Sequence, residues 1–179
     1  MVLSDKLEQN DDDMHLKNNI NRQKGLTFIE LVIVLSVLLT LLGIASINLL
    51  YAQSSASLST SVDTLISDIR NQQLKSISGG TEGRADSDSY GIFFDSSGYT
   101  LFHGTSFNTS DPTNFRVNFS NQIQISNISF PTSVLIFSKG NGEILDFVNG
   151  SNTLTVTNTG SNRQTKIELN QLGVITNLN

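Results

Sequence analysis

The chain has 179 residues, a length that suits one modest domain with appended segments. It contains no cysteine, which excludes disulfides, thiolate metal sites and a cysteine nucleophile. Its net charge is −5, and after Leu26 eleven acids face seven bases, so nucleic acid is disfavoured as the main ligand.

Residues 1–25 form a polar and charged segment. It contains the run Asp11-Asp12-Asp13 and the paired amides Asn18-Asn19, and it shows no apolar face. A segment of this composition cannot bury enough apolar surface to offset the entropy lost on folding. We therefore predict a short solvated leader here.

Residues 26–51 are apolar and predict a transmembrane helix. From Leu31 to Tyr51 there are 21 residues without a formal charge. As a helix they span about 31 Å, which matches the hydrocarbon core of a bilayer. The buried helix of a soluble protein would show a polar face, and here there are only scattered Ser and Thr. A secretory signal peptide, cleaved near Ala45-Ser46, would have a shorter apolar stretch.

The charges beside this apolar segment predict its orientation. Arg22 and Lys24 directly precede it, and no base follows it until Arg70. Because basic residues flank a span on its cytoplasmic side, we expect the N-terminus inside and the rest of the chain outside. The expected topology is a single pass through the membrane.

Residues 52–78 predict a continuation of the helix in amphipathic form. Apolar side chains with a period of 3.6 residues form one stripe: Leu58, Val62, Leu65, Ile66 and Ile69. Gly79-Gly80 supplies a stop signal. We expect one helix from about Thr27 to about Ser78, followed by a linker over residues 79–89.

Residues 90–179 change to a period of two with frequent turn residues, which predicts a β-rich extracytoplasmic head. Asn141-Gly142 and Asn149-Gly150 favour tight turns, and residues 104–114 form the longest expected loop. The expected strands are 90–95, 99–103, 115–119, 123–129, 134–138, 143–148, 152–157, 164–169 and 173–176. The predicted fold class is α+β, a long N-terminal helix packed on a C-terminal antiparallel β-sheet or β-sandwich head.

The junction between leader and apolar segment carries the chemistry. Gly25 lets extended backbone enter a protease cleft, and cleavage after it would leave a new α-amine on Leu26. Glu30 is an isolated carboxylate at the start of an uncharged helix, where a charge is costly and usually paired. One hypothesis is a capping box with Thr27. The other is pairing with the Leu26 amine of a neighbouring subunit, which would set the axial register during assembly.

The run from Lys24 to Val34, KGLTFIELVIV, resembles the processing and methylation region of type IV prepilins and type II secretion pseudopilins. The resemblance implies cleavage after Gly25 by a prepilin peptidase, N-methylation of Leu26 and Glu30 as the family's assembly glutamate. It implies as partners other pilin subunits and an assembly platform in the bacterial inner membrane. The chain departs from the family pattern in having Leu after the cleavage site and no proline in the helix.

Three later segments are similar to the H-type minor pseudopilins: residues 65–73, 90–94 and 166–175. This similarity implies a β-sandwich-like head on the helix. The expected function is that of a minor pilin or pseudopilin in a type IV pilus or type II secretion filament. The expected location is the cytoplasmic membrane, then a cell-surface or envelope filament.

The sequence fits other functions less well than this one. A DNA-binding minor pilin of an uptake pilus should show a basic patch on the head, and the seven bases that follow the apolar segment are dispersed. His15 lies in the leader, so it cannot share a metal site with His103 once the leader is removed, and Asp86 with Asp88 is a weak calcium signal. We expect no cofactor and no metal. We also expect no enzyme activity, because no nucleophile–base pair is evident.

Overall fold

The computed structural model describes residues 25–179. Residues 1–24 of the leader, including Arg22, Lys24 and His15, lie outside the described residues. The described chain divides into two compact units that meet between Ala45 and Ser46. Each unit is considered by itself below.

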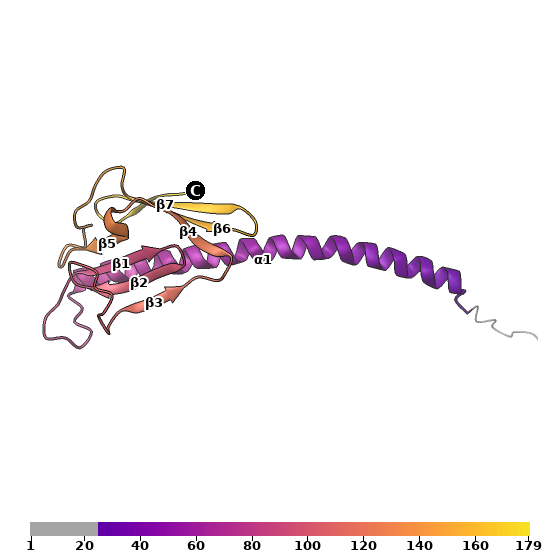
Figure 1. Cartoon of the computed structure of the whole chain (residues 1–179), viewed down its shortest axis with the longest axis horizontal. Helices are drawn as coiled ribbons and strands as arrows, with labels where there is room; N and C mark the ends of the chain where they lie inside the picture. The colour runs from indigo at the N-terminus through magenta and orange to yellow at the C-terminus, as the bar shows by residue number, and fades with distance from the viewer. Residues whose placement is uncertain (1–24) are drawn as a thin grey trace, which may run out of the picture. The chain divides into compact units, whose positions relative to one another are not determined.

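Helix α1 covers Phe28–Ser78, 51 residues, as the sequence predicts (Figure 1). It ends where Gly79 adopts a φ of +69° and the Gly80 N–H donates to the Lys75 carbonyl at 2.9 Å. A left-handed glycine followed by this bond is the usual way to satisfy the last carbonyls of a helix. The two glycines therefore act as the expected stop signal.

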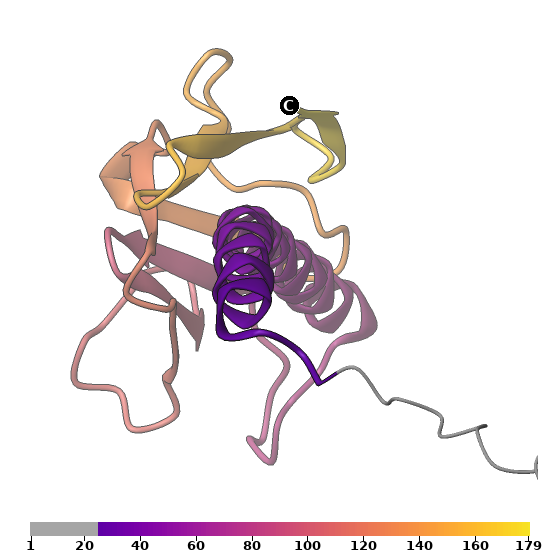
Figure 2. The same ribbon diagram turned by 90° about the vertical axis from the view of Figure 1, so that its right-hand side faces the viewer.

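The second unit contains eight strands in two antiparallel sheets, which confirms the predicted α+β class (Figure 1). One sheet has the order β3-β2-β1-β5 and the other β4-β6-β7-β8. In Figure 2 the yellow strands of the second sheet form a layer distinct from the pink strands of the first. The elements after α1 are β1 (Tyr90–Asp95), β2 (Gly98–His103), β3 (Phe115–Asn118), β4 (Ile123–Ile128), the 3-10 turn η2 (Pro131–Ser133), β5 (Val134–Phe137), β6 (Thr153–Asn158), β7 (Arg163–Leu169) and β8 (Ile175–Leu178).

The apolar stripe of α1 packs into the core of this unit. Leu58, Val62, Leu65 and Ile69 are buried and Ile66 is half-buried, as the periodicity predicts. They share one cluster with buried side chains from both sheets, including Ile92, Phe94, Leu135, Leu154, Val156, Ile167 and Leu169. Burial of such side chains stabilises the fold by about 1.5–3 kcal/mol each.

Polar residues continue the buried stripe toward the end of α1. The Gln72 amide donates from Nε2 to the carbonyls of Gly91 at 2.8 Å and Phe102 at 3.2 Å. The Ser76 hydroxyl donates to the Phe137 carbonyl at 3.0 Å and accepts the Tyr90 N–H at 3.1 Å. Side chains of α1 thus hydrogen-bond the backbone of three strands, and this fixes the helix against the first sheet.

Two strand predictions need correction. Residues 143–148 are not a strand, because only Ile144 pairs with Phe137 and Asp146 then takes a φ of +52°, which breaks the ladder. The last strand begins at Ile175 and not at residue 173, because Gly173 lies in a turn with a φ of +72°. Apolar alternation does not reveal a left-handed residue that ends pairing.

Candidate processing and assembly site

Gly25 and Leu26 lie just before α1 and are exposed. A Cβ added at Gly25 would meet no atom within 4 Å, and its φ is outside the left-handed region. Leu26 is 70% exposed although it is apolar. Within the described chain, nothing requires glycine at position 25.

Thr27 and Glu30 form the start of α1. The Glu30 backbone N–H donates to the Thr27 Oγ1 at 3.3 Å, and the Leu31 N–H donates to the Thr27 carbonyl at 3.1 Å. Thr27 is therefore the N-cap residue, which is one half of the predicted capping box. This bond uses the Glu30 backbone, and the Glu30 side chain is exposed on the first turn, where the helix dipole favours a negative charge.

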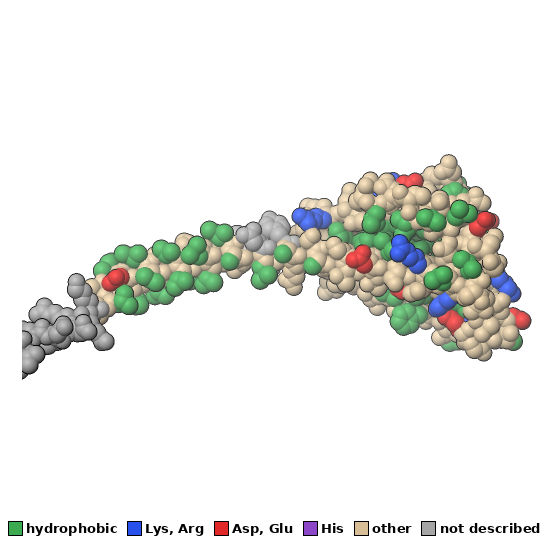
Figure 3. Space-filling model, turned by 180° about the vertical axis from the view of Figure 1, so that it is seen from behind, with side chains coloured by type: hydrophobic (Ala, Val, Ile, Leu, Met, Phe, Trp, Pro, Cys, Tyr) green, Lys and Arg blue, Asp and Glu red, His purple; other side chains and the backbone are tan. Residues whose placement is uncertain are grey.

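The helix that follows is apolar and uncovered. The segment Phe28–Ser46 has a mean hydropathy of 2.7, and none of it is buried. By length and composition it can cross a membrane. In Figure 3 hydrophobic side chains lie along the length of this segment.

Two hydroxyls within this segment are satisfied by the helix itself. Ser36 Oγ donates to the Ile33 carbonyl at 2.8 Å. Thr40 Oγ1 donates to the Val37 carbonyl at 2.8 Å and lies 3.1 Å from the Ser36 carbonyl oxygen. Such back-bonding lets Ser and Thr enter hydrocarbon without an unsatisfied polar group. The scattered polar residues are therefore compatible with a membrane span.

Three bases that follow the apolar segment are bound to acids. Lys75 lies 2.5 Å and Arg84 lies 3.4 Å from the Glu82 carboxylate, and Arg116 pairs with Asp95. Burial opposes ionisation of Glu82, but the hydrogen bonds and charges of Lys75 and Arg84 outweigh it and lower the pKa of that carboxyl. Each of these three cations therefore lies against an acid, and Lys75 and Arg84 share the Glu82 carboxylate.

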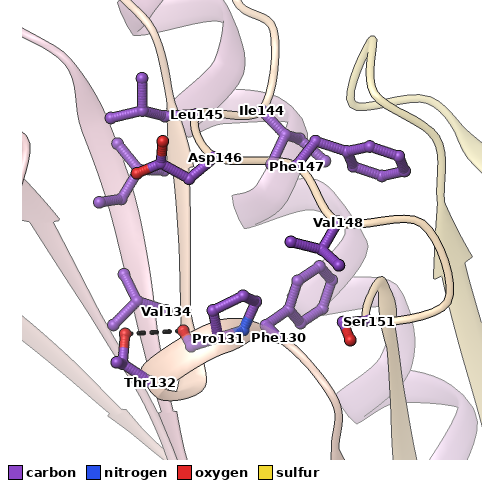
Figure 4. A pocket seen from close by; sticks show the side chains of 11 residues that line it. Phe130, Pro131, Thr132, Val134, Ile144, Leu145, Asp146, Phe147, Val148 and Ser151 are labelled. Atoms are coloured by element: carbon purple, nitrogen blue, oxygen red, sulfur yellow. Dashed lines mark hydrogen bonds between the residues drawn. The ribbon is translucent and has the colours of Figure 1, made fainter.

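A hollow that no sequence pattern indicates lies beside the edge strand β5. It has a volume of about 80 Å³ and is bounded by the segments before and after β5 (Figure 4). Thr132, Ser133 and Asp146, at or next to its rim, have φ values of +53°, +58° and +52°. Left-handed backbone is costly for a β-branched residue such as Thr132. A single sequence carries no signal for these left-handed residues or for the hollow beside them.

Comparison with known proteins identifies one feature. Residues 20–46 match the model of the prokaryotic N-terminal methylation motif. No curated protein and no solved structure matches the chain. The match contains Gly25, Leu26 and Glu30 and stops within the first part of α1.

The chain therefore carries the N-terminus of a type IV pilin-like or pseudopilin-like prepilin substrate. This motif and the apolar helix are compatible with anchoring in a membrane and with processing and assembly of the pilin type. The H-type likeness of the head stays a prediction.

Proposed function

We propose that this protein is a minor pilin or pseudopilin of a type IV pilus or type II secretion filament. One observation carries the proposal: the methylation motif, matched over residues 20–46, runs into the apolar segment Phe28–Ser46, and no part of that segment is buried. An uncovered apolar helix needs lipid or other helices around it. The role is that of a structural subunit and not of an enzyme.

Processing is the first step of the proposed function. A peptidase at the cytoplasmic face cleaves after Gly25, and Leu26 is then N-methylated. Gly25 supports this step because its own chain leaves it open space and an unstrained backbone. The demand for glycine then comes from the cleft of the peptidase, which must admit extended backbone.

Assembly is the second step, and it depends on Glu30. A carboxylate next to hydrocarbon is costly unless a cation pairs with it. The cap at Thr27 involves only the Glu30 backbone. The α-amine of Leu26 on a neighbouring subunit is the cation that can pair with the Glu30 carboxylate. This pair fixes the axial offset between subunits.

The head gives the subunit its specific role. Its likeness to H-type minor pseudopilins favours a type II secretion filament, with the head outside the cytoplasmic membrane. The partners are then other pseudopilins, the prepilin peptidase and an inner-membrane assembly platform.

The deciding experiment is intact-mass analysis of the chain purified from membranes, with and without a co-expressed prepilin peptidase. We expect the peptidase to yield a chain that begins at Leu26 and carries one added methyl group. Without the peptidase the leader should remain attached. A peptidase-treated chain that keeps its leader, or begins elsewhere, would overturn the proposal.

A further inference from the structure

The ring of His103, at the end of β2, lies between two carboxylates. Its Nδ1 is 3.4 Å from the Oδ2 of Asp88, and its Nε2 is 3.4 Å from the Oδ2 of Asp111. Asp88 belongs to the linker before β1, and Asp111 belongs to the loop 104–114. One imidazole thus joins three separate segments of the head.

Each of these carboxylates is already oriented by its own segment. The Asp88 Oδ1 accepts the Ser89 N–H at 2.8 Å. The Asp111 Oδ1 accepts the Thr113 N–H at 2.9 Å and the Thr113 hydroxyl at 2.6 Å. These bonds from Thr113, with smaller contributions from His103 and Arg84, lower the pKa of the Asp111 carboxyl. Both second oxygens are left to face the imidazole.

This arrangement distinguishes the two protonation states of the ring. A neutral imidazole has one N–H and one lone pair, so it can donate to only one of the two carboxylates. The other carboxylate then faces a lone pair. A protonated imidazole donates from both nitrogens and carries a charge that attracts both acids. Only the protonated ring can hold both segments together.

The loop that Asp111 belongs to covers an aromatic surface. Phe107 stacks on Phe93 with ring centroids 4.3 Å apart and lies 5.3 Å from the ring of Phe102. Gly91 makes room for this surface, because a Cβ there would come within 2.4 Å of the Phe102 ring. Release of the loop would expose Phe93 and Phe102.

Other charged groups lie around His103. A cavity of about 280 Å³ is lined by His103 together with Lys75 of α1, Glu82 of the linker and Tyr90 of β1. Lys75 pairs with Glu82, and Arg84 pairs with Glu82 and donates to the Tyr90 hydroxyl at 2.8 Å. These groups are bound to one another, so the charges in contact with the imidazole are those of Asp88 and Asp111.

We propose that His103 is a proton-operated clasp that fastens the loop 104–114 and the linker onto the end of β2. Protonation closes the clasp. As the pH rises and the ring loses its proton, one contact becomes repulsive, the loop loosens and the aromatic surface is exposed. The device is independent of leader processing.

Hydrogen exchange of the full-length chain in detergent micelles tests the clasp. His103 is the only histidine after the leader, so an imidazole titration in the head belongs to it. Imidazole groups change charge between about pH 5 and 8. After correction for intrinsic exchange rates, we expect the amides of residues 104–114 to exchange about two- to fivefold more slowly at the acidic end of this pH range than at the basic end. This factor is the one expected for partly exposed ion pairs. Equal protection at both ends of this range would overturn the proposal.

Three variants separate the clasp from general stability. His103→Gln should remove the pH response of both segments. Asp111→Asn keeps an oxygen for the Thr113 bonds and should remove the response of the loop alone, and Asp88→Asn should act likewise on the linker. Asp63→Asn is the matched control, because Asp63 is an exposed acid of α1 and does not belong to this cluster. This variant should keep the pH response. A pH response that survives in His103→Gln would contradict the clasp.

Discussion

At the scale of single residues, Gly25 is the clearest test of processing. Gly25→Ala should leave an uncleaved precursor in the membrane, because the added methyl group would obstruct the peptidase cleft. The fold itself tolerates the change, since a Cβ at this position meets nothing within 4 Å. Immunoblotting of membrane fractions with and without the peptidase measures the ratio of precursor to mature chain.

Gly43 provides the matched control for this variant. It is also an exposed glycine with no atom within 4 Å of an added Cβ, but it lies inside α1. Gly43→Ala should favour the helix by up to about 1 kcal/mol and be cleaved normally. If both variants are cleaved like the wild type, position 25 has no special role in processing.

Glu30 has two proposed roles that can be separated through Thr27. Glu30→Ala removes the carboxylate, and Thr27→Ala removes the cap that bonds the Glu30 N–H. The cap is worth about 1 kcal/mol of helix stability. We expect both variants to be cleaved, and only Glu30→Ala to enter sheared filaments poorly when co-expressed with the other subunits. Equal loss in both variants would favour the capping role.

Asp95 makes a prediction for acid stability. The hydrogen bond from Arg116, assisted by Ser97, lowers the pKa of the Asp95 carboxyl from 3.8 to about 2. A carboxyl with a lowered pKa in the folded state stabilises the fold above its unfolded value, and this contribution is lost as the pH falls toward the folded value. The melting temperature should therefore fall between pH 3.8 and about 2, and it should fall less in Asp95→Asn. Parallel melting curves for both proteins would contradict this.

At the scale of elements, two leucines of α1 test which face holds the head. Leu65 is fully buried, whereas Leu74 is 60% exposed. Leu65→Ala should destabilise the head by about 2–5 kcal/mol because it opens a cavity in the core. Leu74→Ala should change stability by less than about 0.5 kcal/mol. Chemical denaturation followed by circular dichroism compares them, and similar losses would mean that the packed face is assigned wrongly.

The elements also show what could be predicted from the sequence. The helix and the first hairpin were predictable because their signals are local: apolar periodicity, a glycine stop and a short turn between β1 and β2. The strand prediction at residues 143–148 was wrong because Asp146 has a left-handed backbone, which the apolar pattern does not indicate. The burial of Gln72 could not be predicted, because the apolar periodicity that indicates a buried helix face does not include polar residues.

The candidate sites differ in the same way. Gly25, Leu26 and Glu30 are close together in sequence, so the pattern that identifies them is continuous and their roles could be proposed without a structure. Asp88, His103 and Asp111 are brought together only by the packing of linker, strand and loop. Contacts between distant segments depend on the fold, and a single sequence does not reveal them.

At the scale of the whole molecule, the balance of charge predicts weak binding to DNA. The net charge is −5, and Lys75, Arg84 and Arg116 are paired with Glu82 or Asp95. Phosphate binding depends on cations that can exchange their counterions, and paired cations do this poorly. We expect the chain in detergent to bind duplex DNA no better than about 10⁻⁴ M at physiological salt, the weak end of non-specific binding.

A charge variant makes this expectation sharper. Glu82→Gln combined with Asp95→Asn releases the three paired cations and should raise DNA affinity, with a steep fall as salt increases. Fluorescence anisotropy over a salt series measures both proteins. If the wild type already binds in the micromolar range with that salt dependence, the DNA-uptake alternative gains over the secretion filament. If neither protein binds DNA, the binding is limited by the dispersed positions of the bases. Releasing the three cations from their acids is then not enough to create a basic patch.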